Sequence, residues 1–158
     1  MNLKAELLAE LQQKIDNDIK PAAAMKFSIA GYDGERFALG APKQFNTNHH
    51  GTVFGGSLYA IAAVAGWGVL RCKLDDYQLE GTIVVKEAGM RYLRPVTEDF
   101  VIHTQIHPED DLAQVMQTYR DTGSCNLRIH GEIQNKGKDA AIYDGVYSVK
   151  DLSRLGKR

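Results

Sequence analysis

The feature that most constrains the fold of this 158-residue chain is an apolar run from Ser57 to Leu70 that contains no charged side chain. Charge returns at Arg71. A surface helix has one apolar stripe, whereas a helix that is apolar on every side is buried on every side. The run is therefore expected to form a long central helix that the rest of the chain encloses.

The segments around this run alternate apolar and polar residues, which is typical of half-buried β-strands. Strands are expected within residues 25–42, 81–96, 99–108 and 125–149. The first and last of these segments each contain a turn, at Tyr32–Gly34 and at Asn135–Gly137, so each is expected to be a β-hairpin.

Two further helices are expected. Leucine and isoleucine recur at helical spacing over about residues 2–19, and Pro21 stops the pattern. A short helix should follow Asp110 or Asp111, either of which can cap it. Its apolar residues are Leu112, Val115, Met116 and Tyr119. The basic segment 151–158 is expected to be a tail that frays.

The order of elements is a hairpin, a buried helix and then several long antiparallel strands. A sheet can cover a helix that is apolar all round only by wrapping around it. That arrangement is the hotdog fold, an α+β architecture with an antiparallel sheet around one long helix. Because the sequence shows no linker or repeat, residues 1–150 are expected to form a single hotdog domain.

Composition argues against several functional classes. The 19 basic and 20 acidic residues give a net charge of -1, so there is no positive field to attract nucleic acid. Cys72 and Cys125 are far apart and no N-terminal segment resembles a signal peptide, so a cytoplasmic location is expected. The apolar run is short, and rich in Ala and Gly, for a membrane span of about 20 residues. Neither nucleic acid nor a membrane is expected as a partner.

The loop before the apolar run, NTNHHGTVFGGS at residues 46–57, has the features of a ligand site. Gly51, Gly55 and Gly56 permit positive φ and let a ligand approach the backbone. They lead into the start of the central helix, where the N–H groups of Gly55, Gly56 and Ser57 are expected to be free. Such groups stabilise the negative charge that develops on a thioester oxygen. The same glycines would equally permit tight packing at a helix start.

Two segments of the chain resemble a known family. NHHGTVFGG, residues 48–56, resembles the Asn-x-x-Gly-x-x-His-Gly-Gly loop of hotdog acyl-CoA thioesterases, and YLRPV, residues 92–96, resembles their central strand. A closer similarity is to the YiiD C-terminal family of thioesterase-like proteins, also described as malonyl-ACP decarboxylases. Its loop reads Asn-x-Asn-x-x-Gly-Thr-x-Phe-Gly-Gly-Ser, as in this chain. The resemblance covers about residues 25–150.

The chain departs from the general thioesterase pattern at two positions. Phe54 stands where those enzymes carry His, and Ala63 stands where many carry Asp or Glu. Hydrolysis usually needs a carboxylate to activate water or to attack the carbonyl. No acid occurs between Glu35 and Asp75, so it would have to come from Glu80, Glu87 or a second subunit.

Decarboxylation of a malonyl thioester needs no such acid. Loss of carbon dioxide leaves an enolate, whose oxygen needs hydrogen-bond donors in a site that excludes water. The resemblance implies conversion of malonyl-ACP to acetyl-ACP, in fatty acid synthesis, and no cofactor is expected. Gly55 and Gly56 are expected to bind the oxyanion, Asn46 and Asn48 the carboxylate or thioester oxygen, and Phe54 to exclude water.

The remaining candidates have alternative roles. Ser57 has no evident base partner and is expected to be a first-turn hydroxyl of the helix, or else to contact substrate. Arg91 and Arg94 are expected either to bind the phosphates of a CoA or phosphopantetheine arm or to be solvated strand residues. His49 and His50 are adjacent and lack a third ligand, so no metal site is expected. They are polar loop residues, or one of them protonates the enolate.

Three functions therefore remain open from the sequence. The main reading is decarboxylation of malonyl-ACP, the second is a thioesterase for acyl-CoA or acyl-ACP, and the third is a non-catalytic module that binds an acyl thioester. The expected partner is an acyl carrier protein or a CoA thioester. Because hotdog sites usually lie across a subunit interface, a homodimer or a dimer of dimers is expected.

Overall fold

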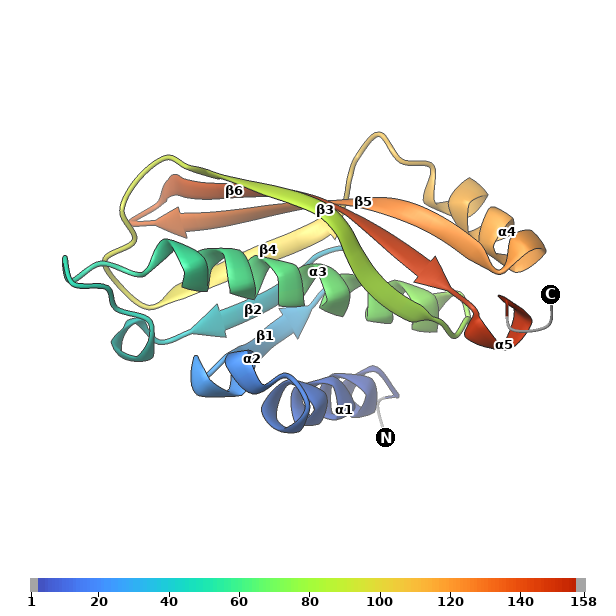
Figure 1. The fold of residues 1–158 in the computed structure, drawn as a ribbon, viewed down its shortest axis with the longest axis horizontal. Coiled ribbons are helices and arrows are strands. Elements are labelled where there is room, and N and C mark those ends of the chain that lie inside the picture. The colour runs from blue at the N-terminus through green and yellow to red at the C-terminus, as the bar shows by residue number, and fades with distance from the viewer. Residues whose placement is uncertain (1–2, 156–158) are drawn as a thin grey trace.

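One buried helix organises the structure. Residues 3–155, which the computed structural model describes, form six antiparallel strands in one sheet around helix α3 (Gly55–Asp76) (Figure 1). The strand order is β1-β2-β4-β5-β6-β3, and α3 contacts β2, β3, β4, β5 and β6. This confirms the predicted α+β hotdog architecture, because the apolar run is the helix that the sheet encloses.

The elements have the following bounds. The strands are β1 (Ser28–Tyr32), β2 (Phe37–Ala41), β3 (Thr82–Tyr92), β4 (Phe100–Ile106), β5 (Ser124–Asn135) and β6 (Lys138–Lys150). The helices besides α3 are α1 (Leu3–Asn17), α2 (Lys20–Ala24), α4 (Leu112–Thr122), α5 (Leu152–Leu155) and the 3-10 turn η1 (Lys43–Phe45).

Turn residues fix the two predicted hairpins. Between β1 and β2, the carboxylate of Asp33 accepts hydrogen bonds from the N–H groups of Glu35 and Arg36, at 2.9 and 2.7 Å. Between β5 and β6, Lys136 and Gly137 both have positive φ, of 52° and 73°. Positive φ at both central residues matches the twist of the flanking strands, so the register of the long β5–β6 pair follows from this turn.

The predicted short helix forms as α4 with both of its ends defined by sequence. The side chain of Asp111, rather than Asp110, caps α4 by accepting a hydrogen bond from the N–H of Gln114. The helix ends at Gly123, whose left-handed backbone with φ of 76° suits glycine.

The N-terminal helix is shorter than predicted. It was expected over about residues 2–19, but α1 ends at Asn17. Pro21 does not simply stop it, because proline is favoured in the first turn of a helix and here lies in the first turn of α2. Residue 2 lies outside the described residues.

Part of the predicted tail is helical. Residues 152–155 form α5, because Asp151 accepts hydrogen bonds from the N–H and the hydroxyl of Ser153, and the Arg154 side chain is fixed against α4. The predicted tail thus contains one short helical turn, and its fraying stays a prediction. Residues 156–158 lie outside the described residues.

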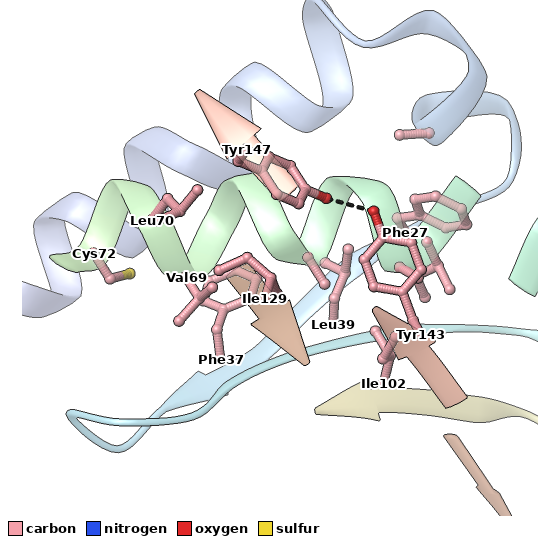
Figure 2. Packing of buried hydrophobic residues seen from close by; sticks show 14 of the residues in the cluster. Phe27, Phe37, Leu39, Val69, Leu70, Cys72, Ile102, Ile129, Tyr143 and Tyr147 are labelled. Atoms are coloured by element: carbon pink, nitrogen blue, oxygen red, sulfur yellow. Dashed lines mark hydrogen bonds between the residues drawn. The ribbon is translucent and has the colours of Figure 1, made fainter. Parts of the chain in front are cut away.

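The helix α3 lies close to the sheet because two glycines leave room for aromatic rings. A Cβ atom at Gly66 would overlap the hydroxyl of Tyr147, and one at Gly68 would overlap the ring of Phe37. Both rings are buried within the cluster that Figure 2 shows. Any larger residue at these positions would push the helix away from the sheet.

Two core hydroxyl groups also donate hydrogen bonds to the backbone of α3. Tyr147 donates to the carbonyl of Ala63 at 2.9 Å, and Thr104 donates to the carbonyl of Ala65 at 3.0 Å. The hydroxyl oxygens of Tyr147 and Tyr143 are 2.8 Å apart (Figure 2). Burial raises the pKa of Tyr147, which keeps its hydroxyl protonated as a donor.

The N-terminal helix covers the part of α3 that the sheet leaves open (Figure 1). Its buried side chains are Leu7, Leu11 and Ile15. At the C-terminal end of α3, the Lys4 ammonium contacts Asp75 at 3.0 Å and Asp76 at 2.6 Å. Core burial and this ion-pair cluster hold α1 in place.

The central helix is also long and apolar enough to cross a membrane, by length and composition alone. Its most apolar window is 61% buried inside the fold, however. This burial is that of a core helix in a globular domain, which agrees with the expectation that the apolar run is not a membrane span.

The close approach at Gly66 gives a first prediction. Gly66→Ala should destabilise the protein by about 1–3 kcal/mol, because the displaced Tyr147 ring is buried and its hydroxyl is bonded on two sides. Urea unfolding followed by circular dichroism measures the change. Gly31→Ala is the control, since a Cβ there meets nothing within 4 Å. Equal stability of the two variants would contradict the packing argument.

Candidate active site

The loop before α3 folds back on itself and is hydrogen-bonded to the segment that follows β3. The N–H of Val53 donates to the carbonyl of Val96 at 2.8 Å, and the N–H of Phe54 donates to the carbonyl of Asn46 at 2.7 Å. Gly51 has φ of 76°, as its predicted role in the turn requires. These contacts determine where the helix begins.

Asn46 lies beneath this loop. Its side-chain amide donates to the carbonyls of Met25 and Pro42, at 2.9 and 2.8 Å, and the residue is 3% exposed. Its Oδ1 atom is the one buried side-chain polar atom without a hydrogen bond among the described residues. Asn46 therefore ties the loop to the segments before β1 and after β2.

Asn48 organises the turn itself. Its Oδ1 atom accepts hydrogen bonds from the N–H groups of His50 and Thr52, at 2.9 and 3.2 Å. Its amide donates to the Thr52 hydroxyl at 2.9 Å. The structure thus brings both predicted asparagines into one loop. Asn48 contacts residues of the loop itself, whereas Asn46 contacts Met25 and Pro42 outside it.

The start of α3 presents two of the three N–H groups that were expected to be free. Within residues 3–155, the N–H groups of Gly55 and Gly56 donate no hydrogen bond. The N–H of Ser57 is not free, because it donates to the carbonyl of Phe54 at 2.9 Å. Phe54 occupies the N-cap position without a side-chain oxygen to satisfy these donors. An anionic oxygen placed here would meet two donors and the positive end of the helix dipole.

A hollow of about 330 Å³ opens beside Gly55. Gly55, Leu58, Tyr92 and Arg94 line it, together with neighbours on the loop and after β3. The Tyr92 hydroxyl donates to the carbonyl of Gly55 at 3.0 Å, which fixes the end of β3 against the helix start. The Arg94 guanidinium donates to the carbonyl of Asp139 at 2.6 Å. Of the described residues that line this hollow, none is Asp or Glu.

The mouth of the hollow is apolar and exposed. Phe54 is 55% exposed, and its ring covers Gly56 so closely that a Cβ there would overlap it. Tyr92 and Leu93 are 55% and 48% exposed. Tyr92 was not singled out as a site residue from the sequence, although the similarity of residues 92–96 to a thioesterase strand pointed to this segment.

The two candidate arginines do not lie together. Arg94 follows the end of β3 and lines the hollow, whereas Arg91, still in the strand, is 3.9 Å from Asp144 on β6. The two possible acids are also elsewhere. Glu80 is near Arg71, at 3.5 Å, and its side chain is 91% exposed. Glu87 lines a separate hollow beside Asp144. In one subunit, neither carboxylate lines the hollow at the start of α3.

The histidines and cysteines form no metal centre. His49 and His50 stack on each other in the loop, with ring centroids 3.8 Å apart, and no group of three ligands occurs among the described residues. Burial raises the pKa of Cys72 to about 12 and that of Cys125 to about 11, so neither thiol is an activated nucleophile.

His130 instead takes part in a charge network away from the hollow. Its ring nitrogens are 2.8 Å from Asp144 and 3.2 Å from Glu132. Burial alone would lower its pKa, but the hydrogen bonds to the two carboxylates outweigh burial and raise it. No spacing along the chain predicts this network, because its members come from two strands.

Comparisons with known proteins agree with this architecture. A family model described as "Putative thioesterase (yiiD_Cterm)" matches residues 8–151. A protein of unknown function from Chlorobaculum tepidum TLS is 25% identical, covering 94% of this chain and 96% of that chain, with a TM-score of 0.87. A "putative thioesterase" from Shewanella oneidensis is 26% identical, covering 93% and 99%, with a TM-score of 0.81. A thioesterase from Haemophilus influenzae, 18% identical over 92% and 91%, shares the fold with a TM-score of 0.71.

The contacts of Asn46 give a second prediction. Asn46→Ala should lower the free energy of unfolding by about 1–3 kcal/mol, because two part-buried carbonyls lose their donors. Urea denaturation of Asn126→Ala is the matched control, since Asn126 is exposed on β5. An Asn46 variant as stable as this control would show that the amide does not hold the loop.

Proposed function

Since the chain belongs to the YiiD C-terminal family of thioesterase-like proteins, we propose that it binds and processes an acyl thioester at the start of α3. The thioester oxygen accepts hydrogen bonds from the N–H groups of Gly55 and Gly56. The observation that carries this proposal is that both groups are unpartnered within residues 3–155 and that Gly55 lines a hollow. Preorganised backbone donors are the usual means of stabilising an oxyanion.

The surrounding residues have supporting roles in this proposal. Arg94 binds the anionic part of the substrate, because its guanidinium lines the hollow and is already oriented by Asp139. Leu58, which lines the hollow, and Phe54, whose ring covers Gly56, exclude water from the thioester. Asn46 and Asn48 act as positioning residues, since they hold the loop that leads to the free N–H groups.

Thioester hydrolysis is the chemistry that the family description and the neighbouring structures favour. It proceeds by attack of water on the thioester carbonyl, with a carboxylate taking the proton of the water. The C–S bond then breaks, and the departing sulfur receives that proton to give the free thiol. Glu80 of a second subunit is our candidate for this carboxylate, with Glu87 as the alternative, because no acid lines the hollow within one subunit.

Decarboxylation of malonyl-ACP is the second candidate, and the acid-free lining of the hollow favours it. The bond between the carboxylate and C2 breaks, and its electron pair forms an enolate whose charge lies on the thioester oxygen. Carbon dioxide leaves, and a proton adds to C2 to give the acetyl thioester. This route needs the oxyanion donors and a dry site, but no base.

We also propose that the protein is a homodimer formed along β3. This 11-residue strand lies at the edge of the sheet, with β6 as its neighbour among the described residues. Val84 and Val85 on it are each 49% exposed. A long apolar edge strand is a template for pairing with another chain. Pairing would also cover Phe54, which is exposed beside the end of β3.

The function is tested by mass spectrometry of the products. The protein is incubated with malonyl-ACP and, separately, with acetyl-, butyryl- and longer acyl-CoA. Free ACP or CoA indicates hydrolysis, and Glu80→Gln should then abolish turnover. Acetyl-ACP with no free thiol indicates decarboxylation, and Arg94→Gln should then slow it roughly tenfold or more. Arg36→Gln is the control, because Arg36 pairs with Glu132 away from the hollow.

Binding measured by thermal shift completes this test. A thioester that raises the melting temperature without yielding any product would identify a non-catalytic binding module. Neither binding nor product with any of these substrates would refute the proposal. A cytoplasmic location, which the two buried free cysteines support, is tested by cell fractionation.

The dimer has its own test. The double variant Val84→Glu, Val85→Glu should be a monomer in size-exclusion chromatography with light scattering, because charges on both faces of the edge strand oppose pairing. Val101→Glu is the control, since Val101 is similarly exposed, at 37%, but lies on the internal strand β4. A double variant that remains dimeric would place the interface elsewhere.

A further inference from the structure

A second hollow lies at the opposite end of α3 from the thioester site. Its volume is about 570 Å³, within the range of small-molecule sites. It is bounded by the segment 78–82 that leads into β3, by the last turn of α4, and by the segment 150–154 that contains α5. Of the residues given a role in the proposed function, Glu80 is the one that lines it.

Three cationic side chains line this hollow, and among the described residues none of them has a carboxylate partner. They are Arg120, Lys150 and Arg154. Arg120 donates to the carbonyl of Tyr77 at 3.0 Å, and Arg154 donates to the carbonyls of Arg120 and Asp121, at 2.7 and 3.0 Å. Bonds to carbonyls orient a guanidinium without neutralising its charge, and of the three cations Arg154 feels the Coulombic attraction of Asp151.

The two acidic residues at this hollow are engaged elsewhere. Asp151 accepts hydrogen bonds from the N–H and the hydroxyl of Ser153, and these bonds lower its pKa. The Glu80 carboxylate lies 3.5 Å from Arg71 and is otherwise in solvent. The N–H groups of Glu80 and Gly81 donate no hydrogen bond within residues 3–155. The hollow thus offers cations and amide donors, the groups that bind phosphate.

The proposed dimer places this hollow beside the thioester site of the other subunit. A two-fold axis pairs an edge strand with its own copy in antiparallel orientation. The Thr82 end of β3 then lies next to the Tyr92 end of the partner's strand. Because Tyr92 contacts the start of α3 in its own subunit, each cationic hollow lies beyond the mouth of the partner's thioester hollow.

We infer that this hollow binds the phosphorylated end of the pantetheine arm whose thioester lies in the partner subunit. The inference rests on the proposed function and dimer. The phosphate chemistry has two possible sources, the adenosine 3′,5′-bisphosphate end of CoA and the phosphodiester that joins the arm to a carrier protein. Each site is then completed by both subunits.

Isothermal titration calorimetry with two probes tests this inference without any turnover. The probes are adenosine 3′,5′-bisphosphate and 4′-phosphopantetheine, and the variant is Lys150→Glu. Lys150 is exposed at the end of β6, so the fold should tolerate the change. Lys138→Glu, at the other end of the same strand, is the control with the same change of charge. The Lys150 variant should weaken probe binding roughly tenfold or more, and the control less than twofold.

The probes distinguish the two sources. Weaker binding of the bisphosphate identifies CoA as the source, and weaker binding of phosphopantetheine alone identifies the phosphodiester. No binding of either probe, or equal loss in both variants, would overturn the inference. Acetyl-pantetheine, which lacks phosphate, should bind the wild type and the Lys150 variant equally. If acetyl-pantetheine bound neither protein, the thioester site would be refuted. The effect of Lys150→Glu on phosphate binding would not be changed by that result.

Discussion

The rest of this structure depends on the burial of most of α3, which leaves a stripe between Tyr59 and Trp67 half-buried or exposed. Exposure of its apolar side chains to water is unfavourable in free energy. The sheet, α1 and α2 therefore pack around the helix. The glycines that face Tyr147 and Phe37 let the sheet approach closely enough to do so. Curvature of the sheet, its antiparallel order and the position of the N-terminal helices are all consequences of this one requirement.

Burial of the helix also explains where chemistry can occur. Most side chains along α3 pack in the core, and its backbone N–H groups are unpaired only in its first turn. The first end carries two unpaired N–H groups and a hollow lined by Leu58, Tyr92 and Arg94. A site built from backbone donors needs few functional side chains. Such a site fits a loop in which Phe54 and Ala63 occupy positions where many thioesterases have polar residues.

Patterns within short segments predicted most of the fold. The apolar run identified α3, alternation identified the strands, and Asp33, Gly137 and Asp111 act as their sequence types predict. Local signals did less well at the chain ends, where Pro21 opens a helix and Asp151 caps one. Propensity alone does not say whether a proline ends one helix or begins the next.

Predictions about the candidate site were limited by contacts between distant residues. The contact of Tyr92 with Gly55 joins residues 37 apart, and the sequence offers no signal for it. Arg91 and Arg94 read alike in the sequence, yet one faces Asp144 and the other lines the hollow, because the strand ends between them. Whether an N–H group at the helix start is free or hydrogen-bonded also depends on backbone geometry. The N–H of Ser57, for example, donates to the carbonyl of Phe54.

The hydrogen bond from Tyr147 to the carbonyl of Ala63 has a consequence for the orientation of α3. A helix with a polar face is oriented by that face, whereas a helix that is apolar all round could rotate about its axis at little cost in hydrophobic free energy. The hydroxyls of Tyr147 and Thr104 each donate a hydrogen bond to one carbonyl of the helix, and these bonds form at only one angle of rotation. That angle also sets the direction in which the N–H groups of Gly55 and Gly56 point. Two hydroxyls in the core therefore determine the orientation of the donors at the N-terminus of the helix.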